Sequence, residues 1–119
     1  MPKETYVLPF GQTTPEDASV ATIYTVGNRN KSVRHAVLTH ISAINLTGAE
    51  RDISIYVDND GGTDWGTGKA IVYQTPLAAN QLMAIDCRIN LKEDATIGVQ
   101  CDAGNAVNFT LSGEEVVER

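Results

Sequence analysis

The sequence predicts an all-β protein: an antiparallel β-sandwich or jelly-roll-like domain of about seven to eight short strands, with little or no helix. Three observations favour this fold class. Apolar residues recur at every second position in several short runs, which is the period of a half-buried strand. Turn residues separate these runs at intervals of about 8–12 residues. No stretch sustains the 3.6-residue period of an amphipathic helix.

The chain has the size and composition of one folded domain. Its 119 residues are 42% hydrophobic and 20% charged, which supplies a core and argues against wholesale disorder. The formal net charge of −6 disfavours nucleic acid or an anionic membrane as the main partner, because phosphate binding needs clustered Lys and Arg. No apolar run approaches the roughly 20 residues of a membrane span, and the first ten residues lack the features of a secretory signal, so we expect folding in a cytoplasm.

Residues 1–17 differ from the rest of the chain. Prolines interrupt this segment, and between them lies an apolar patch of Tyr6, Val7, Leu8 and Phe10. Proline keeps a segment extended and outside central sheet positions. We therefore predict an extended N-terminal arm over 1–17 that lies along a neighbouring subunit, followed by a single sandwich domain over 18–119. An edge strand of the same domain followed by a loop explains the same residues equally well.

The strands expected in the first half centre on two apolar, β-branched runs, 36–46 and 53–57. Polar turn residues separate these runs, so we interpret them as a β-hairpin at the centre of the sandwich. The second run alternates. The first is apolar on both faces, as in a strand that is covered on both sides or that contains a bulge. An earlier strand is expected over 19–26, and the Gly- and Asn-rich residues after it form a turn.

Residues 58–69 form the longest expected loop, and shorter strands follow it. These strands are predicted over 70–75, where Pro76 ends the strand, and then over 81–91, 96–101 and 106–111. In the last three strands the odd-numbered apolar residues are expected to face the core. The acidic residues near the end of the chain are expected to form a solvated terminus or to meet a basic surface on a partner: Glu114, Glu115 and Glu118.

The two cysteines fall on neighbouring predicted strands, which the turn at 92–95 is expected to join into a hairpin. Because both apolar faces of that hairpin must point to the same core, the register sets Cys87 opposite Cys101 or opposite Val99. Either register brings the sulfurs close enough for a disulfide. We predict two free thiols, because a cytoplasm keeps cysteine reduced, and a disulfide is the alternative.

The loop at 58–69 carries the residues that most resemble a ligand site. Asp58, Asp60 and Asp64 suit a calcium loop, but the glycine comes too early for an EF-hand and no bidentate Glu follows. A solvated hairpin loop is the main interpretation, so no metal is predicted. Trp65 in the same loop either plugs the end of the sandwich or forms an exposed anchor for a partner.

The sequence does not assemble a catalytic site. His35 and His40 lie in or beside the first central run, and no nucleophile and carboxylate can be placed near them. His40 is expected to be a strand histidine whose ring has a hydrogen-bond partner. We therefore predict no enzymatic activity and no cofactor.

The order of the segments carries a resemblance. The stretches AVLTHISAINLTG, DISIYV, PLAANQLMAIDCRINLKEDATIGVQCDAG and VNFTLSGEEV follow one another in the sequence. They give an apolar strand, Asn, a small turn, a valine-rich strand, a long loop, Pro-Leu, a long strand, Leu-x-x-Asp, a short strand, a small turn and a final Ser-Gly-Glu. This order resembles that of small virion proteins of tailed bacteriophages, and the match covers roughly Ser19 to Glu115.

The resemblance implies a β-sandwich that assembles on the outer surface of the phage particle after synthesis in the host cytoplasm. Its role would be that of a capsid decoration (cement) protein, or of a head or tail accessory protein. Decoration proteins of this kind are commonly trimers with terminal arms that reach adjacent capsid subunits. The implied partners are therefore the major capsid protein or another virion protein, and further copies of this chain. The expected contact residues are Tyr6, Val7, Leu8, Phe10 and Trp65.

A receptor- or carbohydrate-binding module at a tail fibre is the rival hypothesis. It predicts that solvent-facing aromatic side chains are grouped on one surface of the sandwich. Only 6% of the residues are aromatic, and most of them fall in expected strands or in residues 1–17.

Overall fold

A computed structural model describes residues 3–28 and 30–118, apart from the side chain of residue 118, and within these ranges it contains eight strands and one short 3-10 helix. The expected all-β fold is confirmed. The elements are β1 (Lys3–Thr13), β2 (Ala21–Thr25), β3 (Val33–Asn45), β4 (Arg51–Asp58), η1 (Thr67–Lys69), β5 (Ala70–Leu77), β6 (Leu82–Lys92), β7 (Thr96–Cys101) and β8 (Val107–Glu118). None of the helical structure described is long and apolar enough to cross a membrane.

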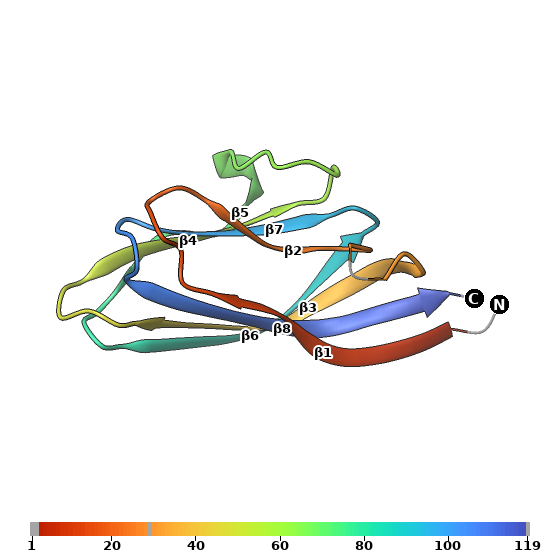
Figure 1. Cartoon of the computed structure of the whole chain (residues 1–119), viewed down its shortest axis with the longest axis horizontal. Coiled ribbons are helices and arrows are strands. Elements are labelled where there is room, and N and C mark those ends of the chain that lie inside the picture. Colours follow the sequence, from red (N-terminus) through yellow and green to blue (C-terminus); the bar gives the residue numbers. More distant parts are fainter. Residues whose placement is uncertain (1–2, 29, 119) are drawn as a thin grey trace.

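The strands form two antiparallel four-stranded sheets. Sheet A has the order β1-β8-β3-β6, and sheet B has the order β2-β7-β4-β5. Figure 1 shows the two sheets as layers, with η1 and the loop that leads to it above sheet B. The molecule extends 51 Å along its longest axis, and sheet A projects beyond sheet B at the end that holds both termini (Figure 1).

The predicted hairpins are wrong in the way their strands pair. The runs at 36–46 and 53–57 lie in β3 and β4, but β3 belongs to sheet A and β4 to sheet B, so the chain crosses between the layers at 46–50. The same is true of β6 and β7, which the turn at 92–95 joins across the sandwich. Each of these connections is an arch rather than a hairpin, because its two strands lie in different sheets.

The core between the sheets explains the unusual pattern of β3. Between Leu38 and His40 the register of β3 shifts against both of its neighbours, β6 and β8. This irregularity is the bulge that was one of the two explanations for the sequence of this run. Before this point the even residues Ala36 and Leu38 face the core, and after it the odd residues Ile41 and Ala43 do. A run that is apolar on both faces therefore follows from one strand that changes its inward face at a bulge.

The last strand is longer than the sequence suggested. The residues expected to form a solvated acidic terminus continue β8 to Glu118, and β8 lies inside sheet A between β1 and β3. Val107, Phe109 and Leu111 face the core as predicted, and Val117 is also buried. β5 likewise continues to Leu77, whereas the strand was expected to end at Pro76.

The N-terminal segment forms an edge strand. β1 pairs with β8 from Lys3↔Glu118 to Thr13↔Phe109, and a register shift falls between Pro9 and Gly11. Of the two arrangements that the sequence left open for residues 1–17, the described part has that of an edge strand followed by a loop. Pro9, which lies within β1, is compatible with this position, since an edge strand tolerates a missing backbone N–H.

Candidate interaction surfaces

The end of the molecule that carries both termini exposes two of the predicted contact residues. Tyr6 lies opposite Glu115 and Val7 opposite Glu114 in the pairing of β1 with β8. Successive strand residues point to opposite faces, so Tyr6 lies on the inner face of sheet A and Val7 on its outer face. Their exposed fractions are 44% for Tyr6 and 80% for Val7. The predicted apolar patch is therefore divided between two faces of one sheet.

Phe10 is not on the surface at all. Its ring is buried and stacks on the ring of Tyr24 from β2, with centroids 3.9 Å apart and planes within 3° of parallel. The Tyr24 hydroxyl donates a hydrogen bond to the carboxylate of Glu115, which is also buried. Gly113 makes room for the ring, because a β-carbon added there would lie 2.6 Å from Cζ of Phe10. Phe10 thus ties β1 to β2 across the sandwich and cannot contact another protein in this conformation.

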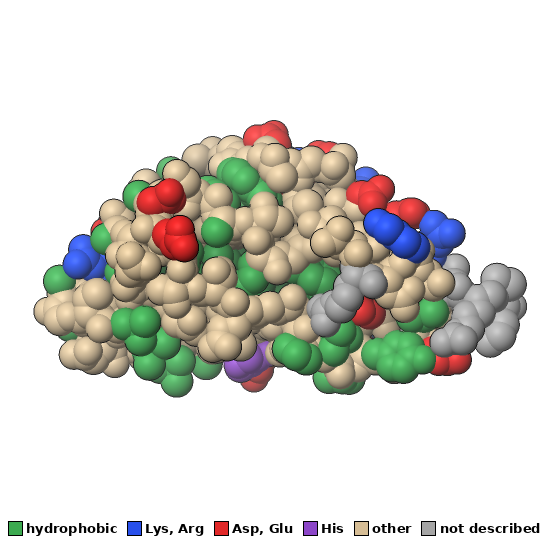
Figure 2. Space-filling model, viewed as in Figure 1, with side chains coloured by type: hydrophobic (Ala, Val, Ile, Leu, Met, Phe, Trp, Pro, Cys, Tyr) green, Lys and Arg blue, Asp and Glu red, His purple; other side chains and the backbone are tan. Residues whose placement is uncertain are grey.

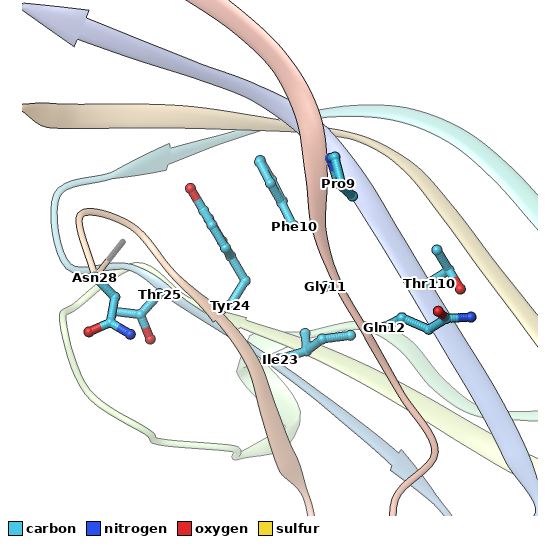
Figure 3. Close-up of a pocket in the computed structure, with 9 residues that line it drawn as sticks. All are labelled: Pro9, Phe10, Gly11, Gln12, Ile23, Tyr24, Thr25, Asn28 and Thr110. Carbon is cyan, nitrogen blue, oxygen red and sulfur yellow. The ribbon is translucent and has the colours of Figure 1, made fainter. Parts of the chain in front are cut away.

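A hollow of about 530 Å³ lies beside this stack, between the edge strands β1 and β2. Figure 3 shows the parallel rings of Phe10 and Tyr24 side by side between the two strands. The polar groups that line the hollow are amides and hydroxyls, from Gln12, Thr25, Asn28 and Thr110. No carboxyl, imidazole or amine occurs among the described lining residues, and the phenol of Tyr24 donates its hydrogen bond to Glu115, so the hollow could bind a polar group.

Trp65 does not stand out as an exposed anchor. Its indole is partly buried and lies on the outer face of sheet B, 6.1 Å from the ring of Tyr56 between centroids. Gly98 on β7 leaves space for it, since a β-carbon there would lie 3.0 Å from Cη2 of Trp65 and 2.6 Å from Cγ1 of Val20. The loop at 58–69 is thereby pinned over the sheet instead of closing the end of the sandwich.

The three aspartates of this loop do not form a cation site. The buried carboxylate of Asp58 accepts backbone hydrogen bonds from Asp60 and Asp64, both at 2.9 Å. These bonds, followed by the nearby Lys69, hold the pKa of Asp58 below its ordinary value. The Lys69 ammonium lies 3.4 Å from Asp58 and also pairs with Asp60, which raises the pKa of Lys69. The Lys69 ammonium therefore neutralises carboxylates of this loop. The described residues contain no cluster of three or more side chains suited to a metal.

Both cysteines are free thiols, as predicted, but they are not strand neighbours. Cys87 is half-buried on the inner face of β6, where its Sγ lies 3.5 Å from the carbonyl oxygen of Leu38. Cys101 is fully buried on β7 in the other sheet. Burial raises the pKa of both thiols, and the carboxylates of Asp86 and Asp102 add to this effect.

The ring of His40 has a hydrogen-bond partner, as the sequence predicted. Nδ1 of His40 lies 2.9 Å from Oδ1 of Asp86, its partner on β6. His35 lines a shallow depression with Asn59 and the end of β6.

Sequence reasoning missed an apolar patch on the outer face of sheet A. Ile44, Leu46 and Leu82 have exposed fractions of 37%, 55% and 60%, and Ile44 lies opposite Leu82 in the pairing of β3 with β6. Figure 2 shows hydrophobic side chains in two groups along the lower rim, one toward each end. The signal was present in the sequence, because Leu82 and Ala84 place apolar residues on the otherwise polar face of an alternating strand.

The exposed aromatic residues do not form one surface. Only Tyr6 and Tyr73 are exposed among the aromatic side chains, all of which are described. Tyr6 lies on β1 in sheet A and Tyr73 on β5 in sheet B, which are edge strands on opposite sides of the sandwich. The grouped aromatics that the carbohydrate-binding hypothesis predicts are therefore not found.

Comparison with solved structures finds similar folds, and among them are chains of viral particles. A chain of the T13 particle of infectious bursal disease virus is similar over 97% of this chain and 30% of its own length, with a TM-score of 0.54 and 8% identity. A chain of the Gx strain of that virus matches over 98% of this chain and 32% of its own length, with a TM-score of 0.50 and 12% identity. A chain of the virus-like particle of the giant freshwater prawn extra small virus matches over 96% and 78%, with a TM-score of 0.48 and 14% identity.

This chain spans about a third of the length of the two bursal disease virus chains. At these identities the likeness concerns the fold, a two-sheet β-sandwich. No protein-family model matches the sequence. No curated protein matches it either.

Proposed function

We propose that this chain is a non-enzymatic structural protein of a tailed-phage virion, a decoration (cement) protein that binds the capsid lattice and stabilises the head. The observation that carries the proposal is the two-sheet sandwich, which this chain shares with chains of viral particles. The order of its segments, which resembles small phage virion proteins, supports the same role. The partners are the major capsid protein or another virion protein and further copies of the chain, as a trimer by the same resemblance.

We assign the contact with the particle to the terminal end of sheet A, which consists of residues 3–8 of β1 and 113–117 of β8. It projects beyond sheet B and exposes Val7 on one face and Tyr6 on the other (Figure 1). Burying one valine side chain contributes about 1.5–3 kcal/mol at most. Such a small term becomes effective on a lattice, because an oligomer that binds through several copies gains from the high effective concentration of the remaining sites.

The experiment is a binding assay on phage heads that lack this protein. Purified protein is mixed with the heads, and the bound fraction is measured by co-sedimentation. We expect the wild-type chain to bind and the double variant Tyr6→Ser, Val7→Ser to lose most of its occupancy. Ile71→Ser on β5 is the matched control, because it removes a similar exposed apolar side chain from the other sheet.

Two results would contradict the proposal at different levels. Full occupancy by the double variant would show that the terminal end is not the contact surface. Absence of wild-type binding, together with a particle reconstruction that has no density for the chain on the head, would remove the decoration role itself.

A further inference from the structure

We infer that the edge of β6 is a strand-pairing site for a second copy of this chain, which joins the two sheets A into one continuous sheet about a two-fold axis at Ile85. The inference rests on the edges of the two sheets, on the direction of the backbone groups of β6 and on the residues that the pairing would bring together. It concerns a two-fold dimer of the isolated chain in solution and not the trimer proposed for the phage head, so it stands or falls independently of that role.

The four edge strands differ in how well they are protected from pairing. β1 contains Pro9 and a register shift, and β2 has five residues and a register shift. β5 has two register shifts, Pro76 and a positive φ of 44° at Gln74. Prolines, bulges and short length are the usual protections of an edge strand. β6 has one register shift against β3, between its residues 86 and 89, but it has eleven residues, no proline and unbroken alternation of exposed and half-buried side chains up to Leu91, so it is the least protected of the four edges.

The backbone groups of β6 show which residues face the open edge. Asn45 donates its N–H to the carbonyl of Gln81, so odd-numbered residues at this end point toward β3. At the other end the side chain of Asn59 bonds the carbonyl of Asn90 and the N–H of Lys92, both even-numbered and both pointing away from β3. The even residues from 82 to 88 therefore carry the open donors and acceptors, while Asn59 covers the edge at 90–92.

The extent of the open edge fixes the register. An antiparallel pair around a two-fold axis uses all of residues 82–88 on both copies only if the axis passes through Ile85. Leu82 then lies opposite Arg88 of the second copy, and Ala84 lies opposite its Asp86. The even–even pairs are the hydrogen-bonded ones, as the open backbone groups require. An axis at Cys87 would instead set Ala84 against Asn90, where the Asn59 side chain already lies.

The side chains fit this register on both faces. On the outer face the apolar stem of Arg88 would cover Leu82 of the other copy, which is 60% exposed in the single chain. On the inner face the half-buried Met83 would meet Cys87, and Ile85 would meet its own copy. These side chains pack only partly on the core of the single chain, so the second copy would complete their burial.

The test is the oligomeric state of the purified full chain, measured by sedimentation velocity over a wide range of protein concentration. We expect a reversible dimer. Ala84→Pro should give a monomer with an unchanged circular dichroism spectrum, because it removes an N–H that by the same alternation points to the open edge and away from β3. Ala84→Thr keeps that N–H and is expected to remain a dimer.

A second pair of variants tests the register. Ala84 is exposed and would face Asp86 of the second copy, so Ala84→Lys creates an attractive pair and Ala84→Glu a repulsive one, each occurring twice per dimer. We expect the dissociation constant of Ala84→Lys to be lower than that of Ala84→Glu by about tenfold or more at low salt.

Three results would overturn the inference. The first is a wild-type chain that stays monomeric at every concentration, and the second is a dimer that Ala84→Pro does not weaken. The third is equal dissociation constants for the Lys and Glu variants, which would exclude the axis at Ile85. A monomeric wild type that still binds phage heads would refute this inference alone.

Discussion

The burial of Phe10 makes the strongest prediction about the isolated chain. If residues 1–17 were an arm that anchors to another protein, truncating Phe10 would weaken binding and leave the stability of the free chain unchanged. In the structure the ring is buried against Tyr24 and lies directly over Gly113. Phe10→Ala should therefore lower the free energy of unfolding of the chain itself.

The size of the effect follows from what surrounds the ring. Replacing a buried Phe by Ala costs about 3–5 kcal/mol, and the upper part of that range applies where the site cannot collapse. Collapse is restricted here because Gly113 has no side chain to move into the space and Tyr24 is held through its hydroxyl by Glu115. A loss of about 4 kcal/mol is a large share of the roughly 5–15 kcal/mol that stabilises a typical domain. It would lower the Tm by about 12–20 °C.

The assay is urea unfolding at neutral pH, followed by circular dichroism and by the fluorescence of Trp65. The midpoint should fall while the slope stays constant, since the surface exposed on unfolding barely changes. Val7→Ala is the matched control on the same strand, and because Val7 is exposed the change should stay within about 0.5 kcal/mol. A loss below about 1 kcal/mol for Phe10→Ala would show that β1 is not docked as described.

Three further predictions concern the loop, the acid limb of stability and the thiols. Gly98→Ala should displace the indole of Trp65, shift its emission to the red and cost about 1–3 kcal/mol, whereas Gly48→Ala, whose β-carbon would meet nothing within 4 Å, should leave the emission unchanged; equal spectra would contradict the packing. The folded-state pKa of Asp58 lies below its ordinary value of 3.8, so its contribution is complete above that pH and is lost as the pH falls through the lowered pKa. The difference in urea midpoint between wild type and Asp58→Asn should therefore shrink on going from pH 7 into this acid range, and a constant difference would refute the role of the charge. The buried Cys101 should resist iodoacetamide in the native chain and react in urea, which mass spectrometry of the labelled peptide can decide.

The sequence predicted the strands better than their partners. Alternation in 81–91, 96–101 and 106–111 identified three strands and their inward faces, because the period of a half-buried strand is a local property. Whether two successive strands pair or face each other is not local. A short polar turn fits both cases, and in both the apolar faces point to the same core. The hairpins expected between β3 and β4 and between β6 and β7 failed for this reason.

The acidic end of the chain shows a second limit. A segment with Glu114, Glu115 and Glu118 looks solvated by composition, yet it forms the end of a central strand. Glu115 is buried because the hydroxyl of Tyr24 donates to it from a strand 91 residues away along the chain. The residues near Glu115 in the sequence do not indicate that partner. Buried polar groups with distant partners are therefore the residues that local patterns place least well.

The site predictions follow the same division. Composition located the exposed Val7 and Tyr6, but it could not tell that the two side chains point to opposite faces or that the Phe10 ring is buried against Tyr24 of the other sheet. The alternation of β6 contained the exposed Leu82, although its importance depends on β6 lying at the edge of its sheet. Edge or centre is decided by the whole topology.

The order of strands in sheet A also sets when the protein can fold as it leaves the ribosome. β1 is made before the other described strands, and its only hydrogen-bonded neighbour among them is β8, which also separates β1 from β3. At about 5–20 residues per second, β8 emerges on the order of 5–20 s after β1. During this interval β1 has no strand to join, and the nascent chain exposes apolar side chains such as that of Phe10. A chaperone that holds extended apolar segments would therefore be expected to raise the yield of native protein more than one that acts on the finished chain.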